Sequence, residues 1–187
     1  MSPYSRGMHA SGVLAGPALT VKTRPGDNLM VHKAIDIAEQ GHVIVVDAGG
    51  DLTNAIIGEM MLSHAVKRGV AGFVINGAIR DVAAIRKGIT PVYAAGVTLR
   101  GPYKNGPGEI NNTIAIAGMV IEPGALMLGD EDGFLCIPFD EVSTVLANSQ
   151  AKHKAEVTQM AAIHAGTSNR KWVDETLSQL GCEIAVK

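Results

Sequence analysis

Glu59, Arg80 and Asp81 have the residue types and the spacing of a metal-assisted site. Twenty residues separate Glu59 from the adjacent pair Arg80 and Asp81. Carboxylate oxygens suit Mg²⁺ or Mn²⁺, and the planar guanidinium of an arginine suits a carboxylate or a developing enolate. Together these groups could hold a small 2-oxo acid on a divalent cation, whose charge would polarise the keto carbonyl for cleavage of an adjacent C–C bond.

Each of these residues also has an ordinary structural interpretation. Asp81 precedes a predicted helix, and aspartate is a preferred N-cap residue. One of its carboxylate oxygens could cap that helix while the other faces a cation. Arg80 alone is typical of a solvated or ion-paired loop residue, and Glu59 alone is a first-turn acid favoured by the helix dipole. It is the spacing of the three residues that favours a site.

The elements that must position this trio alternate along the middle of the chain. Buried strands are predicted at residues 42–47, 70–75 and 91–95, and helices at 28–39, 81–87 and from a cap at Thr53 or Asn54 to about Arg68. This alternation predicts a parallel sheet covered on both faces. Loops that follow parallel strands emerge at one edge of the sheet, so residues 58–61 and 78–81 are expected to face one crevice.

The remaining segments differ from this central part. Short β runs at residues 19–21, 113–121, 126–128 and 134–137 indicate hairpins or a small β layer, and residues 100–112 form a loop rich in Gly, Pro and Asn. Helices are predicted at 140–165 and 171–180, and their partly polar character suits an oligomer contact. No linker or repeat divides the chain, so one domain over residues 1–187 is predicted.

Composition excludes several other classes of protein. The net charge is -2 and no basic stripe carries interleaved aromatic residues, which argues against nucleic-acid binding. Apolar runs such as 43–46 and 114–121 are too short to span a membrane, and residues 1–14 lack the apolar region of a signal peptide. We therefore expect a cytoplasmic protein, in which the two cysteines, Cys136 and Cys182, are free thiols.

The residues around the trio resemble a known family. The stretch GEMM at 58–61 and the run RGVAGFVINGAIRDVAAIR at 68–86 are similar to the 4-hydroxy-4-methyl-2-oxoglutarate aldolase family. That family includes the 4-carboxy-4-hydroxy-2-oxoadipate aldolases and the relatives called regulator of ribonuclease activity A (RraA). Its hallmark is an acidic residue, an interval of the length found here, and then Arg-Asp. The similarity extends from about Leu14 to the end of the chain.

The resemblance implies a fold and an assembly. The fold would be of the swivelling β/β/α type, an α/β domain with a central, mostly parallel sheet and C-terminal helices. The assembly would be a homotrimer or a dimer of trimers, with sites at the subunit interfaces. An acid from a neighbouring subunit's C-terminal region would complete the metal shell, and Asp174 and Glu175 are the candidates.

The resemblance also assigns roles within the site. Asp81 and its waters would bind Mg²⁺ or Mn²⁺, and Arg80 would contact the carboxylate and keto oxygen of the substrate. Glu59 would hold metal-bound water. The pyruvyl carboxylate would rest on the backbone of four consecutive residues, Gly58, Glu59, Met60 and Met61.

The implied activity is retro-aldol cleavage of 4-hydroxy-2-oxo diacids, of the 4-hydroxy-4-methyl-2-oxoglutarate or 4-carboxy-4-hydroxy-2-oxoadipate type, to pyruvate. Oxaloacetate decarboxylation would be a related activity, and a non-catalytic, ribonuclease-binding regulator is the alternative. Ala84 stands where the regulator-type pattern has an acidic residue, which favours the enzyme. Asn76 and Ala125 stand where the family pattern has Asp, and the segment before Leu14 is shorter than in relatives.

Overall fold

The computed structural model describes residues 6–10 and 12–184. The chain divides into two compact units, Met1–Val142 and Ser143–Lys187. The first unit carries the sheet and the predicted site. The second consists of C-terminal helices.

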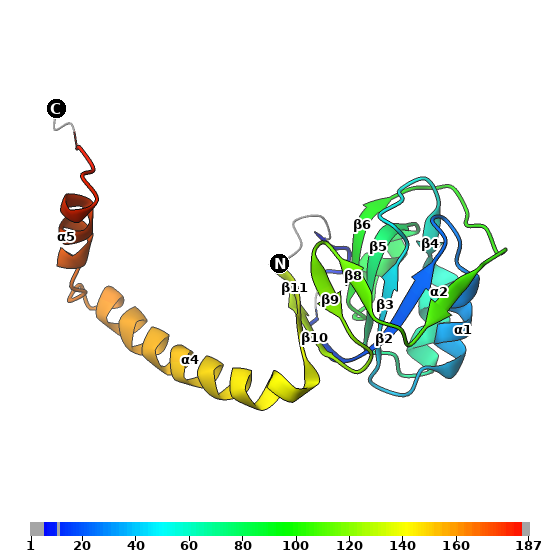
Figure 1. Ribbon diagram of the computed structural model, residues 1–187, viewed down its shortest axis with the longest axis horizontal. Coiled ribbons are helices and arrows are strands. Elements are labelled where there is room, and N and C mark those ends of the chain that lie inside the picture. The colour runs from blue at the N-terminus through cyan, green and yellow to red at the C-terminus, as the bar shows by residue number, and fades with distance from the viewer. Residues whose placement is uncertain (1–5, 11, 185–187) are drawn as a thin grey trace. The chain divides into compact units, whose positions relative to one another are not determined.

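Nine strands of the described chain form one sheet, in the order β1-β6-β5-β3-β2-β10-β11, with β4 beside β5 and β7 beside β2 (Figure 1). Strands β2, β3, β4, β5 and β6 pair in parallel with their neighbours in this group, and the other pairings are antiparallel. A separate hairpin is formed by β8 (Ile114–Ile116) and β9 (Met119–Ile121). The strands of the sheet are β1 (Arg6–Gly7), β2 (Leu14–Thr23), β3 (Val43–Asp47), β4 (Ala55–Ile57), β5 (Gly72–Ile79), β6 (Val92–Val97), β7 (Gly108–Ile110), β10 (Leu126–Asp130) and β11 (Gly133–Ile137).

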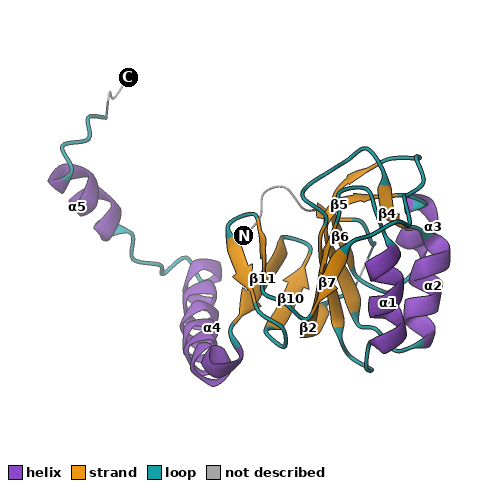
Figure 2. Cartoon of the chain, turned by 45° about the vertical axis from the view of Figure 1, so that its right-hand side comes forward, coloured by secondary structure: helices purple, strands orange, loops and turns teal. Residues whose placement is uncertain are grey.

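The parallel part of the sheet is covered by helices on one face and by β-structure on the other. Helices α1 (Leu29–Ile37), α2 (Glu59–Lys67) and α3 (Val82–Lys87) lie together on one face (Figure 2). Their apolar side chains share one core cluster with the strands. A second cluster joins the other face to the β8–β9 hairpin and to β10 and β11. This layering confirms the predicted α/β fold with a central, mostly parallel sheet and C-terminal helices.

Strand β2 joins the antiparallel strands β10 and β11 to the parallel part of the sheet. Its first half pairs with β10, where Leu14 lies opposite Gly129, and its second half pairs with β3, where Ala18 lies opposite Val43. Alternate side chains of a strand point to opposite faces, so Leu19 and the residues in phase with it join the helix-side core. The predicted strand at 19–21 is therefore the central part of a much longer element.

The predicted helix start at Thr53 or Asn54 is wrong. Residues Ala55–Ile57 form β4, and α2 begins at Glu59. Thr53 instead donates to Asp51, and the buried side chain of Asn54 donates to the carbonyl of Gly101. Neither side chain caps a helix, because the hydrogen bonds of both go to residues of neighbouring loops.

The second unit contains α4 (Val142–His164) except for its first residue, and α5 (Lys171–Gln179). None of its described residues, 143–184, is buried. Among the described residues of the whole chain, no helix combines the length and the apolar character needed to cross a membrane. Cys136 and Cys182 are free thiols, as predicted, whereas the prediction of one domain over residues 1–187 stays a prediction.

Candidate active site

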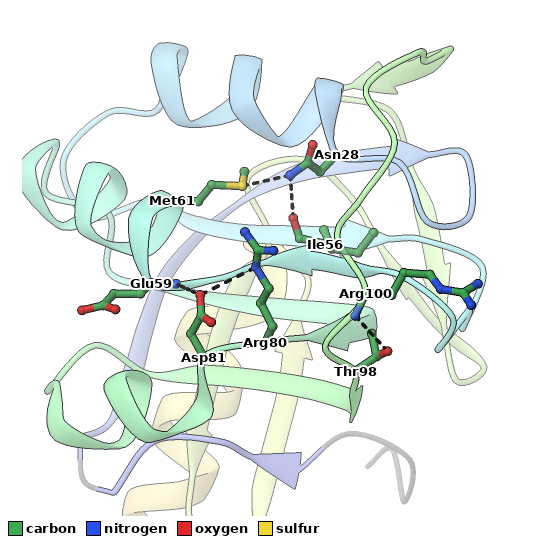
Figure 3. A network of polar contacts seen from close by, with 8 residues as sticks. All are labelled: Asn28, Ile56, Glu59, Met61, Arg80, Asp81, Thr98 and Arg100. Carbon is green, nitrogen blue, oxygen red and sulfur yellow. Dashed lines mark hydrogen bonds and ion pairs between the residues drawn. The ribbon is translucent and has the colours of Figure 1, made fainter.

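The pairing of β4 with β5 brings the two predicted site segments together. These strands are parallel, with Ala55 opposite Ala78 and Ile57 opposite Ile79. The chain leaving β4 therefore lies beside the chain leaving β5, where the backbone N–H of Arg80 donates to the carbonyl of Ile57 at 3.0 Å. Glu59, Arg80 and Asp81 consequently meet at one edge of the sheet (Figure 3).

Asp81 occupies the N-cap position of α3 but does not cap that helix with its side chain. Its backbone is left-handed, with φ 59° and ψ 35°, a conformation that aspartate tolerates better than most residues. Its Oδ2 accepts the backbone N–H of Glu59 at 3.0 Å. The carboxylate therefore caps α2, the neighbouring helix.

Arg80 lies against the same carboxylate oxygen. Its Nε is 3.7 Å from Asp81 Oδ2, and both side chains are 42% exposed. Ion pairs this exposed contribute only about 0–1 kcal/mol to stability. The contact therefore orients the guanidinium more than it stabilises the fold, and Figure 3 shows the guanidinium extending toward Met61 and Asn28.

Gly58 permits this close packing. Its φ is -146°, an extended value that any residue adopts, so its backbone conformation does not require glycine. A Cβ on Gly58 would instead overlap Asp81 Oδ2 and would lie 3.0 Å from both Cγ and Nε of Arg80. The absence of a side chain at this position is what lets the Arg80–Asp81 pair reach the start of α2.

A cleft of about 210 Å³ opens beside these residues. Of the predicted site residues, Gly58, Met60, Met61 and Arg80 line it, whereas Glu59 and Asp81 do not. The Glu59 carboxylate points away from Arg80 and Asp81 (Figure 3). The lining residues are Asn28, His32, Ala55, Ile56, Ile57, Gly58, Met60, Met61, Arg80, Pro102 and Lys104. Since this set holds Arg80 and Lys104 but no Asp or Glu, the cleft is suited to an anionic ligand.

The first turn of α2 supplies further donors. Leu62 is the first residue of α2 whose N–H bonds within the helix, to the carbonyl of Gly58 at 3.1 Å. The N–H of Glu59 is taken by Asp81, so those of Met60 and Met61 remain without an intrahelical acceptor. Such groups at a helix start favour a carboxylate or phosphate.

Three polar residues of the cleft, Asn28, His32 and Lys104, were not predicted, and neither were its apolar residues Ala55, Ile56, Ile57 and Pro102. Buried Asn28 donates from Nδ2 to the carbonyl of Ile56 and to Met61 Sδ, each at 3.0 Å, while its Oδ1 has no partner among the described residues. Asn28 and His32 are spaced i and i+4 in the sequence, which places both on one face of a helix. This spacing could have indicated that the two side chains face the same site. Lys104 gave no such signal, because it lies in the predicted loop.

His32 is held in its neutral form. Burial lowers its pKa below 6.5, and the charge of Lys104 lowers it further. His64 acts in the same direction, whereas Asp36 opposes the shift. At neutral pH the imidazole therefore serves as a hydrogen-bonding group rather than as a third cation.

The described residues at this site offer only part of the ligands that a cation needs. No group of three His, Cys, Asp or Glu residues that could hold a metal ion occurs in the described chain. Asp81 offers one carboxylate, and its Oδ1 forms no hydrogen bond within residues 6–10 and 12–184. Mg²⁺ in proteins is usually bound by one or two carboxylates and keeps several waters, so a single carboxylate is compatible with this ion. Asp174 and Glu175 lie on α5, in the other unit.

Comparison with known proteins places the chain in a family. Residues 1–136 match the model of the RraA-like family, described as Aldolase/RraA, and the chain belongs to this family. It is 42% identical over 150 residues to a protein of Halalkalibacterium halodurans that is named provisionally as a 4-hydroxy-4-methyl-2-oxoglutarate aldolase, covering 80% of this chain and 71% of that relative. The predicted family resemblance is thus confirmed.

Two matches from Thermus thermophilus carry different names. One, named 4-hydroxy-4-methyl-2-oxoglutarate aldolase, is 35% identical over 112 residues, which cover 60% of this chain and 68% of the relative. The other is a solved structure described as the RNA-processing inhibitor RraA. It superimposes with a TM-score of 0.70 at 30% identity, over 74% of this chain and 84% of that one. The comparison confirms the fold and leaves both functions to be considered.

Proposed function

We propose that this protein is a divalent-metal-dependent lyase that cleaves 4-hydroxy-2-oxo diacids to release pyruvate, and that it also decarboxylates oxaloacetate. The observation that carries the proposal is the joint position of Arg80 and Asp81 at the start of α2, beside a cleft lined by cationic groups and by no carboxylate. The aldolase names of two relatives support the same reaction class.

Within this proposal, the residues of the cleft bind and orient the pyruvyl half of the substrate. The N–H groups of Met60 and Met61 hold its carboxylate, because they lack intrahelical acceptors. The Arg80 guanidinium lines the cleft and reaches the keto oxygen. When the bond between carbons 3 and 4 breaks, the 4-hydroxyl gives its proton to water and the electron pair of the bond forms an enolate, which takes a proton from water at carbon 3 to give pyruvate. Negative charge develops on the keto oxygen in this step, and a preorganised guanidinium stabilises it.

Asp81 would hold Mg²⁺ or Mn²⁺ beside the cleft, and the Glu59 carboxylate, which points away from Arg80 and Asp81 (Figure 3), would turn toward the cation to hold its waters. A bound cation supplies Lewis-acid polarisation of the keto group. The chain's own contribution is to position the Asp81 carboxylate. The left-handed backbone of Asp81 and the hydrogen bond that its carboxylate accepts from the Glu59 N–H fix the direction of this side chain. Asp174 or Glu175 of a neighbouring copy would complete the ligand shell.

The proposed assembly is a homotrimer or a dimer of trimers in which the C-terminal helices contact a second copy. None of the described residues 143–184 is buried, and helices depend mainly on tertiary packing for stability. Exposed large apolar side chains in this part include Leu146, Val157, Met160, Ile163, Trp172 and Leu180. Light scattering after gel filtration measures the assembly directly. A monomer at micromolar concentration would contradict the proposed oligomer.

The function is tested by measuring pyruvate release from 4-hydroxy-4-methyl-2-oxoglutarate and from oxaloacetate, with Mg²⁺ or Mn²⁺ and after chelation. The expected result is metal-dependent release that Arg80→Ala and Asp81→Ala abolish. Asp132→Asn is a matched control, because Asp132 is exposed in the β10–β11 turn and away from the cleft. A protein that binds Mn²⁺ but releases no pyruvate from either compound would contradict the proposal.

A second candidate function is a non-catalytic regulator that binds a ribonuclease complex. It is favoured by the likeness to the RNA-processing inhibitor of Thermus thermophilus. Two apolar side chains near the same edge of the sheet, Met60 at 78% and Leu99 at 92% exposure, offer a surface for such contact. Co-purification with a ribonuclease, together with no lyase activity, would select this function over the first.

A further inference from the structure

Asp27 is a buried carboxylate outside the Arg80–Asp81 site. Its side chain has no exposed surface. Three backbone N–H groups point at it: Oδ1 accepts from Leu29 at 2.9 Å, and Oδ2 accepts from Asn105 at 2.6 Å and from Gly106 at 3.0 Å. Hydrogen bonds to an ionised acceptor are among the stronger ones in proteins. One carboxylate therefore joins the start of α1 to a loop that lies 78 residues further along the chain.

The same loop is fastened at other points along its length. Tyr103 donates its N–H to the carbonyl of Gly26 at 2.9 Å and accepts from the N–H of Asn28 at 3.1 Å. Nearer Arg80, the carbonyl of Arg100 accepts the N–H of Ala55 at 2.9 Å. Residues 100–106 therefore follow the edge of the sheet, and Asp27 provides the last attachment before β7.

This loop forms a wall of the cleft. It contributes Pro102 and Lys104 to the lining, which also includes Asn28 and Arg80. A Cβ placed on Gly101 would lie 3.6 Å from Nη1 of Arg80, so the loop backbone runs close to the guanidinium. Lys104 stands next to Asn105, whose N–H Asp27 binds. Lys104 therefore lies between two residues whose backbone is attached to the start of α1, Tyr103 and Asn105.

We propose that Asp27 is a positioning residue, which ties the loop 100–106 to the start of α1 and thereby keeps Lys104 on the wall of the cleft that it shares with Arg80. The role of Lys104 in attracting an anionic substrate rests on the proposed function. Asp27 itself touches no substrate in this proposal. Its effect reaches the ligand only through the loop.

The test compares Asp27→Asn with the wild type in two measurements. Asn cannot accept all three N–H groups, because its amide nitrogen donates. The first measurement is hydrogen exchange of the segment 98–107, which is expected to speed up. The second is steady-state pyruvate release, in which KM is expected to rise about tenfold with kcat within about threefold, the pattern of lost substrate binding. Asp27→Ser is the second variant should Asp27→Asn fail to fold, because serine retains a cap for Leu29 and does not reach the loop.

Two comparisons separate positioning from a general loss of stability. Tyr93→Phe removes a partly buried hydrogen bond, from the Tyr93 hydroxyl to the carbonyl of Asp130 at 2.6 Å, at a place apart from the cleft. It is expected to lower the melting temperature while leaving KM and loop exchange unchanged. Lys104→Gln is expected to raise KM as Asp27→Asn does, and the double variant to raise it no further than either single change.

Several outcomes would overturn the inference. Unchanged exchange of the loop in Asp27→Asn, or a KM shift equal to that of Tyr93→Phe, would show that Asp27 does not position the wall. Additive effects of Asp27→Asn and Lys104→Gln would show that it does not act through Lys104. If the wild type releases no pyruvate, the proposed function fails, and loop exchange together with calorimetric titration of pyruvate and Mg²⁺ decides the positioning role by itself.

Discussion

The carboxylate of Asp81 accepts the backbone N–H of Glu59 at 3.0 Å, so an aspartate at the start of one helix caps the next helix along the sheet. This bond connects the ends of β4 and β5. It occupies one carboxylate oxygen and leaves the other free for a ligand. The residue can therefore serve the structure and the proposed metal site at the same time.

Asp81→Asn should separate these two roles. Asparagine adopts left-handed backbone as readily as aspartate and keeps an oxygen for the Glu59 N–H, but it lacks the negative charge that a hard cation prefers. We expect a melting temperature within a few degrees of the wild type, roughly the shift for 1 kcal/mol, with Mn²⁺ affinity and pyruvate release both lost. Calorimetric titration of Mn²⁺ and the release assay measure this. Retention of full activity would remove Asp81 from the metal site.

Gly58→Ala should damage the site more than the fold. The added Cβ overlaps Asp81 Oδ2 and crowds Arg80, and a displacement of about 1 Å in a positioned group lowers catalysis about 100-fold. Gly88→Ala is the matched control, because its Cβ would meet the carbonyl of Ile85 at 3.5 Å, an ordinary contact. Pyruvate release and thermal unfolding of both variants give the comparison. Equal activity of the two would mean that the close approach at Gly58 is unimportant.

Removing the charge of Lys104 should change the titration of His32. Burial contributes most to the lowered pKa of His32, and Lys104 comes second. In Lys104→Gln the imidazolium loses an unfavourable neighbour, so the pKa should rise while remaining below its ordinary value. NMR titration of the histidine ring protons gives the value. An unchanged His32 titration would place the Lys104 ammonium away from the cleft.

Asp27 should contribute to acid stability. Burial by itself would raise its pKa, but the backbone N–H groups of Leu29, Asn105 and Gly106, with the charge of Arg24, hold the pKa below 3.8. A pKa lower in the folded than in the unfolded state gives stability that is present above the unfolded value and is lost as the pH falls through the folded value. Urea unfolding at pH 6 and at about pH 3 should therefore show a smaller loss of unfolding free energy for Asp27→Asn than for the wild type. Identical losses would contradict the depressed pKa.

The central alternation of strands and helices could be predicted from the sequence because each element carries its own apolar pattern. The helix predicted at 28–39 is found at Leu29–Ile37, and the strand predicted at 42–47 is found at Val43–Asp47. Strand β4 could not be found in this way. It is three residues long and is followed almost at once by a helix, so its apolar residues were absorbed into the helical pattern.

The candidate site was predictable only where it is local in sequence. Arg80 and Asp81 are adjacent, and their spacing from Glu59 is visible in the chain. The direction of the Asp81 carboxylate toward α2 depends on its left-handed backbone, which no residue pattern indicated. The bonds from Asp27 to Asn105 and Gly106 join segments far apart in sequence. Such contacts arise from the folded path of the chain and leave no periodic signal.

Different parts of the chain hold the Arg80–Asp81 pair and form the wall of the cleft. The register of β4 on β5 holds Arg80 and Asp81 through main-chain pairing, whereas the wall, residues 100–106, is attached by a few side-chain and backbone bonds. Surface loops tolerate replacement far better than paired strands do. A lineage can therefore exchange the wall for one of another shape or charge while the main-chain pairing that holds Arg80 and Asp81 stays in place. A change confined to this loop could therefore alter which ligand the cleft binds.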